Sequence, residues 1–205
     1  VYKRQGMRDA MPARKPKGRL LRWAIHRGIF TFARVGRELP SGRRHLSHVK
    51  VHRDIAYGPD PAHRLDVYHP VHQGRGRPVL LYVHGGGFAF CSKDTHWSFA
   101  ARYARMGFVV VNIDYRLAPG HKFPAAFDDA AAALVWALDH AADYGGDPTR
   151  LVLAGESAGG NLVTSLAAAC AYRLEHPSAA DLYARAPQVT ALLPACGVLQ
   201  VSEIE

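Results

Sequence analysis

The feature that most constrains the fold of this chain is a regular alternation of short apolar runs with longer segments of helical pattern. The apolar runs are four to six residues long, as expected for strands buried on both faces, and are Val79–Val83, Phe108–Ile113, Leu151–Ala154 and Val189–Leu193. The helical segments that separate them are Thr95–Met106, Phe123–Tyr144 and Ala158–Leu174. This alternation predicts an α/β fold in which helices flank a mostly parallel sheet.

A different pattern precedes the first apolar run. Residues 49–57 and 63–68 alternate between apolar and polar side chains, and Pro59-Asp60-Pro61 lies between them. Two alternating segments joined by a proline-rich turn are typical of an antiparallel hairpin. We therefore expect two antiparallel strands ahead of the parallel part of the sheet.

Composition excludes several classes of protein. The chain has 205 residues, of which 48% are hydrophobic, so it can bury a substantial core without disulfides or metal. Its three cysteines form an odd number without paired spacing, which excludes a disulfide scaffold. We interpret Cys91, Cys170 and Cys196 as small buried apolar side chains. No signal peptide or membrane-spanning segment is recognisable, which predicts a cytoplasmic protein.

The basic charge of the chain is concentrated near its N-terminus. Residues 1–53 hold 15 of the 26 Lys and Arg but only two of the 17 Asp and Glu. The overall charge of +9 therefore arises from this segment, and it does not indicate nucleic-acid binding by the protein. We interpret residues 1–5 as adapter-derived, residues 6–47 as a basic helical segment and residues 48–205 as the folded core.

One amphipathic helix is predicted within the basic segment. The apolar residues of Leu20–Val35 share one face at i, i+3, i+4 and i+7 spacing, and arginines lie around the other side. Such a helix either packs on the domain or lies on a membrane surface. We interpret the helix as packed on the domain, and a weak membrane-surface contact through residues 20–37 is the alternative. The spacing does not indicate the oligomeric state.

The strongest chemical signal is GESAGG at residues 155–160, which has the form G-x-S-x-G. It stands directly after a predicted strand and directly before a helix, which is the context in which this motif holds a nucleophilic serine. Gly155 and Gly159 leave room for a strained turn, and the helix N-terminus beside Ser157 favours negative charge. We therefore expect Ser157 to be a nucleophile rather than part of an ordinary glycine-rich turn.

The second signal is HGGGF at residues 84–88, at the end of the strand Val79–Val83. Consecutive glycines let backbone N–H groups approach a substrate closely, as an oxyanion hole requires. Ala158, the residue after the nucleophile, would supply one further N–H donor. A phosphate-binding loop is the alternative, but no Lys-Ser or Lys-Thr pair follows the glycines.

Four motifs occur in a fixed order along the chain: HGGGF at 84–88, DYRLAP at 114–119, FPAA at 123–126 and GESAGG at 155–160. Together they resemble the hormone-sensitive-lipase family of α/β-hydrolases, which are mainly microbial carboxylesterases. The resemblance covers roughly residues 50–200. It implies the α/β-hydrolase fold and a serine hydrolase that cleaves small carboxylic esters with short or medium acyl chains, without a cofactor or metal.

The same resemblance implies roles for individual residues. Ser157 would form an acyl intermediate, and the N–H groups of Gly86, Gly87 and Ala158 would bind the oxyanion, with Gly85 shaping the loop. Residues 6–47 would form part of an N-terminal helical cap over the site. The alternative within the same fold is a non-catalytic ligand-binding protein that keeps the serine but lacks the histidine.

The chain does not present a complete triad in the expected order. In α/β-hydrolases the order is Ser, then Asp or Glu, then His. After Ser157 the one histidine, His176, precedes Asp181. We therefore expect the triad acid, the triad histidine and the last strands of the fold to lie beyond Glu205, and residues 1–205 alone to be nearly inactive. A pseudoenzyme, or a base supplied by an upstream histidine, remains the alternative.

Other polar residues have structural interpretations. Asp114 or a nearby acid would pair with Arg116, because a buried charge needs a partner. Asp128 and Asp129 lie where a helix begins, which suits its dipole. Glu156 would support the site rather than serve as the triad acid. The twelve histidines lack Cys or acidic partners at ligand spacing, so no metal site is predicted.

Overall fold

The computed structural model describes residues 28, 31, 33, 35–72, 74–197 and 199. The segment 1–5 and most of the predicted helix Leu20–Val35 lie outside these residues. Among the helices that are described, none is both long enough and apolar enough to cross a lipid bilayer.

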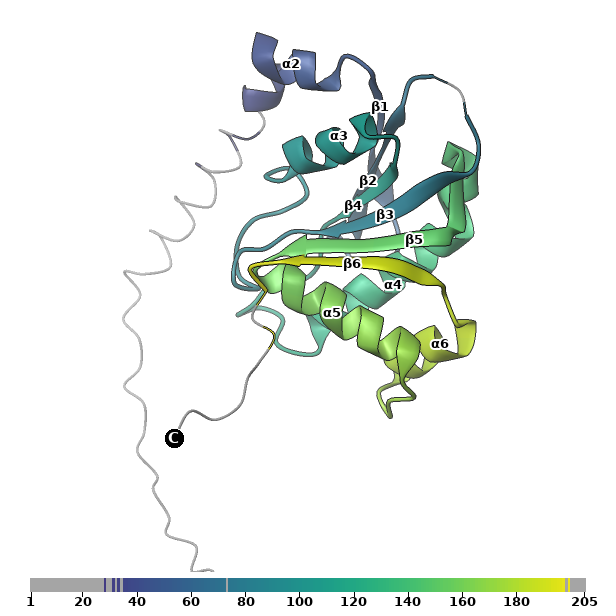
Figure 1. Ribbon diagram of the computed structural model, residues 1–205. Helices are drawn as coiled ribbons and strands as arrows, with labels where there is room; N and C mark the ends of the chain where they lie inside the picture. Colours follow the sequence, from purple (N-terminus) through teal and green to yellow (C-terminus); the bar gives the residue numbers. More distant parts are fainter. Residues whose placement is uncertain are drawn as a thin grey trace, which may run out of the picture.

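The described residues form one six-stranded sheet in the order β1-β2-β4-β3-β5-β6 (Figure 1). Its strands are β1 (Val49–Ala56), β2 (Arg64–Pro70), β3 (Arg77–Val83), β4 (Val109–Ile113), β5 (Gly146–Glu156) and β6 (Val189–Ala195). β2 pairs antiparallel with both β1 and β4, whereas β4, β3, β5 and β6 run parallel. The predicted hairpin and the mostly parallel sheet are both confirmed.

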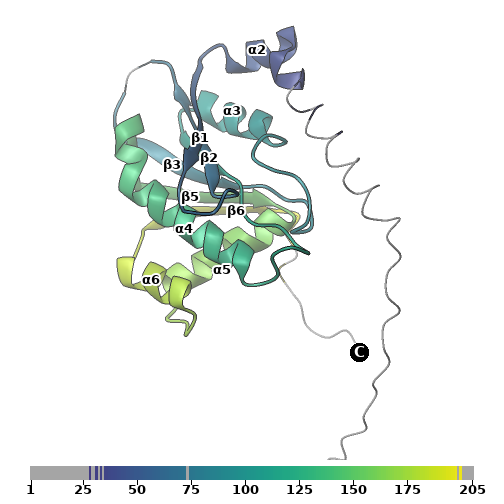
Figure 2. The same cartoon turned by 180° about the vertical axis from the view of Figure 1, so that it is seen from behind.

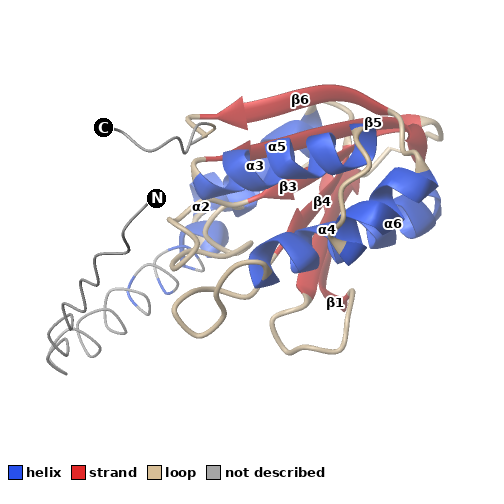
Figure 3. Ribbon diagram, turned by 90° about the horizontal axis from the view of Figure 1, so that it is seen from below, coloured by secondary structure: helices blue, strands red, loops and turns tan. Residues whose placement is uncertain are grey.

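Helices cover both faces of this sheet, which gives the molecule three layers (Figures 1 and 2). On one face lie α2 (Pro40–Leu46) and α3 (Trp97–Arg105). On the other lie α4 (Ala125–His140), which the 3-10 turn η1 (Ala141–Tyr144) continues, α5 (Ala158–Ala171) and α6 (Pro177–Arg185). Figure 3 shows the molecule from the side of these three helices.

The central strands explain why the apolar runs are continuous rather than alternating. Along β3, Val79 and Leu81 belong to the core cluster under α4 and α5, while Leu80 and Tyr82 belong to the cluster under α3. Each of these side chains is at most 3% exposed. Because both faces are covered by helices, successive residues must all be apolar.

The helices differ from the predicted bounds mainly after Ser157. α5 ends at Ala171 rather than Leu174, and the polar segment that follows forms the additional helix α6. Pro177 suits the first turn of α6, but only Ala179 and Leu182 in it are buried, which is too few to form a recognisable apolar stripe.

The interpretation of the cysteines as buried apolar side chains is wrong for Cys196, which is exposed. Cys91 and Cys170 are half-buried. Cys196 directly follows β6, at one edge of the described sheet, where no neighbouring strand covers it.

Candidate active site

The two loops that carry the strongest motifs meet because their strands are neighbours. β3 and β5 pair in parallel with Val83 opposite Gly155, so both strands end at the same edge of the sheet. The glycine loop, residues 84–88, follows β3, and Ser157 follows β5. The carboxyl edge of a parallel sheet is where α/β folds usually bind ligands.

Ser157 lies in a tight turn between β5 and α5. Its φ of 52° and ψ of −115° are unusual for a residue other than glycine. The Ser157 N–H donates to the carbonyl of Ala195 at 2.8 Å, and the Ser157 carbonyl accepts from the N–H of Asn161 at 3.1 Å. Ser157 itself is half-buried, while Ala158 at the start of α5 is buried. Strain of this kind persists only where the surroundings enforce it, and it is concentrated at functional sites.

Close backbone packing explains the glycines on either side of Ser157. A Cβ on Gly155 would lie 2.6 Å from the carbonyl oxygen of Gly159. A Cβ on Gly159 would overlap the carbonyl of Val83 and lie 2.8 Å from that of His84. The turn after β5 therefore packs directly against the start of the glycine loop.

The glycine loop turns at Gly86 and Gly87, whose φ values are 108° and 59°. The Gly86 carbonyl accepts hydrogen bonds from the N–H groups of Ala89 at 3.1 Å and Phe90 at 3.0 Å. A Cβ on Gly86 would overlap the Phe90 carbonyl, whereas a Cβ on Gly87 would have no atom within 4 Å. Gly86 is thus enclosed by the loop, and Gly87 borders open space.

His84, the first residue of the loop, is buried beneath it. Its ring stacks on Tyr115 at a centroid distance of 4.4 Å, and its Nδ1 lies 2.7 Å from the carbonyl of Gly85. Burial lowers the pKa of His84 to about 3, so the ring is neutral at physiological pH and Nδ1–H donates to Gly85. His84 therefore holds the start of the loop in place.

A second histidine beside the loop is paired with Glu156, an arrangement that the sequence did not indicate. His96 Nε2 lies 3.2 Å from Glu156 Oε1, and His96 Nδ1 lies 2.8 Å from Thr95 Oγ1. A Cβ on Gly85 would overlap the Glu156 carboxylate, so this pair lies against the glycine loop. The supporting role expected for Glu156 remains a prediction. The two partners are 60 positions apart in sequence, and no local spacing relates them.

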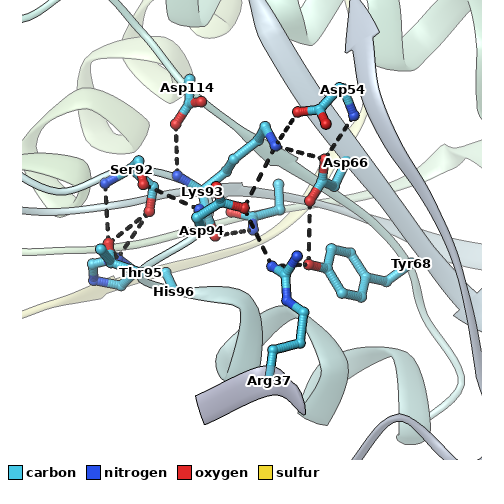
Figure 4. Close-up of polar contacts among 11 residues, drawn as sticks. Arg37, Asp54, Asp66, Tyr68, Ser92, Lys93, Asp94, Thr95, His96 and Asp114 are labelled. Atoms are coloured by element: carbon cyan, nitrogen blue, oxygen red, sulfur yellow. Dashed lines mark hydrogen bonds and ion pairs between the residues drawn. The ribbon is translucent and has the colours of Figure 1, made fainter. Parts of the chain in front are cut away.

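A cluster of charged side chains surrounds Lys93, which lies between β3 and α3 (Figure 4). Lys93 Nζ lies 2.7 Å from Asp54 Oδ1 and 2.8 Å from Asp66 Oδ1, and the Lys93 side chain is 3% exposed. Burial lowers the pKa of Lys93, but the facing carboxylates outweigh this effect and raise it, so the ammonium stays charged. The Lys93 N–H also donates to Asp114 Oδ1 at 2.6 Å. Burial raises the pKa of that carboxyl to about 7.

Arg116 pairs with Asp129 and not with Asp114. The shortest contact, from Arg116 Nη2 to Asp129 Oδ1, is 2.6 Å, and the Arg116 N–H donates to Asp129 Oδ2 at 2.8 Å. His63 Nε2 lies 3.0 Å from the same carboxylate. The prediction of a nearby acid as the partner is confirmed. Asp129, however, is 1% exposed, and it forms a buried ion pair in addition to lying at the start of the helix where the dipole favours an acid.

His176 is not brought to Ser157. α5 has 14 residues and is about 20 Å long, with Ser157 before its first turn and His176 after its last. There His176 Nε2 lies 3.5 Å from Asp128 Oδ1, and Asp181 contacts Arg185. Within the described ranges, no three His, Cys, Asp or Glu side chains are grouped as the ligands of a metal ion would be.

Comparison with known proteins identifies the family. The model that describes the α/β-hydrolase fold matches residues 80–200, more than half of the chain, and the chain belongs to this family. Within it, the protein is of the hormone-sensitive-lipase type that the four motifs predicted.

Three of its relatives are esterases. The carboxylesterase NlhH of Mycobacterium tuberculosis is 46% identical over 102 residues, which are 49% of this chain and 32% of that protein. A bacterial heroin esterase superposes with a TM-score of 0.57 at 32% identity, over 75% of this chain and 46% of that one. EstE1, a thermophilic carboxylesterase cloned from a metagenomic library, gives a TM-score of 0.54 at 37% identity, over 69% and 47% of the chains. The matched part of this chain thus spans about half the length, or less, of these relatives.

Proposed function

We propose that this protein hydrolyses small carboxylic esters through an acyl intermediate on Ser157. The observation that carries the proposal is the strained turn at Ser157, packed against a glycine loop at the carboxyl edge of the sheet. The relatives named above are esterases, which supports the same type of reaction here.

In the proposed reaction, Ser157 Oγ attacks the ester carbonyl carbon and its proton passes to a base. The carbonyl oxygen becomes an oxyanion that accepts hydrogen bonds from the N–H groups of Gly86, Gly87 and Ala158, while Gly85 shapes the loop. The alcohol then leaves with the proton, and the acyl group stays on Ser157. Water attacks the acyl carbon in the same way and releases the acid. Donors fixed before the reaction stabilise the developing charge with little reorganisation.

None of the described histidines takes the role of base in this proposal. His84 is neutral and donates to Gly85, His96 is paired with Glu156, and His176 Nε2 lies 3.5 Å from Asp128 Oδ1 of α4. The alternative function, a ligand-binding protein of the same fold that uses this site without catalysis, also stays a prediction.

The test is the replacement Ser157→Ala in the protein expressed from its complete gene. Hydrolysis of p-nitrophenyl butyrate should fall by about 10⁶ in kcat, because the nucleophile of the triad is removed. Thr164→Ala is the matched control, since the Thr164 hydroxyl bonds to the Gly160 carbonyl of its own helix at 2.9 Å.

Retention of a tenth of the activity by Ser157→Ala would remove this residue from the proposed role. A parent protein that binds a butyrate ester but does not hydrolyse it would instead support the ligand-binding alternative.

Four further expectations stay predictions. They are the cytoplasmic location, the cap formed by residues 6–47, the weak membrane contact of residues 20–37 and the absence of nucleic-acid binding. Vesicle flotation and DNA retention with and without residues 6–37 test the last two.

A further inference from the structure

Two histidines on the outer hairpin of the sheet, here called the histidine pair, lie with their ring nitrogens in contact. His52 of β1 stands opposite Val67 of β2, and His69 of β2 stands opposite Lys50. The two histidines are therefore diagonal neighbours on one face of the hairpin, a spacing that long side chains bridge. Their Nε2 atoms lie 3.2 Å apart.

The histidine pair lies at the opposite edge of the sheet from Ser157. Tyr68, which precedes His69, pairs with Val110 near the start of β4, whereas Ser157 follows the end of β5. Because β4, β3 and β5 run parallel, the starts and the ends of these strands form two different edges. What the histidine pair binds is therefore independent of the ester chemistry proposed above.

Backbone and ring contacts hold both rings in position. β1 changes register between His52 and Ile55, and such an irregularity fixes the direction of the neighbouring side chains. The Tyr144 ring of η1 lies edge-on to His52 at a centroid distance of 4.9 Å and is tilted against His69 at 6.2 Å. Both histidines are half-buried, so the pair is supported from one side and open to solvent from another.

The hydrogen bonds of His69 leave a nitrogen lone pair directed at His52. His69 Nδ1 lies 3.1 Å from the carbonyl of Pro70, which only accepts, so Nδ1 carries the proton and Nε2 of the neutral ring is unprotonated. Burial is the main cause that lowers the pKa of both rings, which makes them neutral at physiological pH. A carbonyl bonded to the second ring nitrogen is typical of histidines that bind metal ions.

The distance between the two Nε2 atoms matches the separation of two ligands on one metal ion. Zinc binds imidazole nitrogen at about 2.0–2.1 Å, and two such bonds at about 100–105° to each other place their nitrogens about 3.2 Å apart. This angle lies between those of octahedral and tetrahedral coordination. Without metal, His52 Nε2–H donates to His69 Nε2. When an ion binds, this proton moves to His52 Nδ1, which leaves one lone pair on each Nε2.

We propose that His52 and His69 form a binding site for one divalent zinc, copper or nickel ion, which water completes. Imidazole nitrogen suits these ions, whereas magnesium and calcium prefer oxygen ligands. Water takes the other positions because, in the part of the chain that the structure describes, no third His, Cys, Asp or Glu joins the pair. The ion connects the edge strand β1 to β2. The sequence did not indicate this site, since its two ligands are 17 positions apart.

The experiment is a calorimetric titration with zinc chloride of the protein expressed from its complete gene, without a histidine tag and after treatment with EDTA. His52→Gln and His69→Gln should each weaken zinc binding by at least about tenfold, because a ligand is lost. His72→Gln is the matched control. The rings of His72 and His48 also stack nearby, but their centroids are 6.5 Å apart, compared with 5.3 Å in the histidine pair. This control should bind zinc as the parent does.

Electron paramagnetic resonance with one equivalent of Cu²⁺ counts the coordinating nitrogens directly. The parent and His72→Gln should show two imidazole nitrogens, and His52→Gln and His69→Gln should show one. Melting temperatures without metal confirm that each variant is folded. A single imidazole nitrogen in the parent, or equal zinc affinity in the parent and both ligand variants, would overturn the inference.

Lys50 provides a test of opposite sign. It is exposed and stands opposite His69, and its charge, like that of Arg77, acts to lower the pKa of His69. A neighbouring positive charge opposes a bound cation, so Lys50→Gln should tighten zinc binding by about two- to tenfold at low salt and by less at high salt. Weaker zinc binding in Lys50→Gln would contradict the proposed location of the ion.

The two proposals fail separately. Ser157→Ala should bind zinc as tightly as the parent, because Ser157 lies at the other edge of the sheet. Ester hydrolysis without zinc binding to the parent would overturn the metal site and leave the proposed function intact. Zinc binding that requires both histidines would support the metal site even in a protein that hydrolyses no ester.

Discussion

Gly86 and Gly87 are adjacent in the glycine loop but meet different steric constraints. An added Cβ at Gly86 would overlap the Phe90 carbonyl at a φ of 108°, whereas at Gly87 it would enter open space at a φ of 59°. Gly86→Ala should therefore cost about 1–3 kcal/mol of stability and, by moving a donor, lower kcat by about 10²–10³. Gly87→Ala should cost about 1 kcal/mol and act mainly on substrate binding.

Melting temperature and kcat per folded molecule, measured on a short-chain ester, check this pair of variants. The oxyanion charge exists mainly in the transition state, so KM should change less than kcat in Gly86→Ala. If kcat is unchanged in both variants, the loop does not bind the oxyanion.

Asp114 should make the stability of the protein depend on pH. Burial raises the pKa of its folded-state carboxyl to about 7, above the value of roughly 4 expected in the unfolded chain. The folded state therefore holds this proton more firmly, and the stability it contributes is present below pH 4 and lost as pH rises through about 7. Asn at this position stays neutral. Asp114→Asn should thus gain about 1–3 kcal/mol relative to the parent between pH 5 and pH 8.

Urea unfolding of both proteins at several pH values measures this difference. Burial lowers the pKa of His84 to about 3, so in the folded parent protein this ring is neutral throughout the range from pH 5 to pH 8. Asp181→Asn is the control, because the Asp181 side chain is 58% exposed. A constant difference between parent and Asp114→Asn from pH 5 to pH 8 would contradict the prediction.

At the scale of elements, Asp129 ties α4 to the loop that follows β4. Its carboxylate accepts from the Arg116 guanidinium and backbone N–H and contacts His63, with a 1% exposed side chain. Asp129→Ala would leave Arg116 without its partner, and removing one member of a buried pair costs about 3–5 kcal/mol. Chemical unfolding should show this loss.

Asp139→Ala on the same helix is the comparison for Asp129. The Asp139 side chain is 51% exposed and lies 3.4 Å from Arg185, whose side chain is 40% exposed, so its removal should cost less than about 1 kcal/mol. Equal losses in the two variants would mean that the Asp129 pair contributes no more than a surface ion pair.

At the scale of the whole molecule, Arg37 attaches the basic N-terminal segment to the core (Figure 4). Its Nη2 lies 3.2 Å from the Tyr68 hydroxyl of β2 and 3.4 Å from Asp94, and its guanidinium lies 5.7 Å from the Trp97 ring centroid of α3. The side chain is 5% exposed. Arg37→Met keeps the apolar stem and removes the charge, which should cost about 1–3 kcal/mol.

Limited proteolysis provides a second measurement for Arg37. Cleavage between Val35 and Ser47 should become faster in Arg37→Met because the segment loses its attachment. Arg43→Met is the matched control, since the Arg43 side chain is 73% exposed and contacts only the exposed Glu38, at 3.7 Å, among its charged neighbours in the described structure. Unchanged cleavage in Arg37→Met would show that this attachment has another origin.

Much of the fold followed from local patterns. The run Val79–Val83 is apolar at every position because helices cover both faces of β3, and this property is visible in the sequence itself. Ser157 and the glycine loop were recognisable for a similar reason. A strained turn and a close approach of two backbone segments limit which residue types fit at adjacent positions. The constraint is therefore visible as a short sequence motif.

The partners of the buried charged and polar side chains could not be predicted from local sequence patterns. His96 meets Glu156 across 60 positions, and Lys93 meets Asp54 across 39, because the chain returns to the same edge of the sheet several times. Several acidic residues are close to Arg116 in the sequence and could have been its partner. The packing of α4 against the loop after β4 places Asp129 beside it. By itself the sequence determined which segments form the strands and the helices α3, α4 and α5, but not α6, and which turns need glycine, since short-range sterics and burial act on neighbouring residues. The tertiary structure decided which distant charges meet, because strand order and helix packing bring together residues that no spacing in the sequence relates.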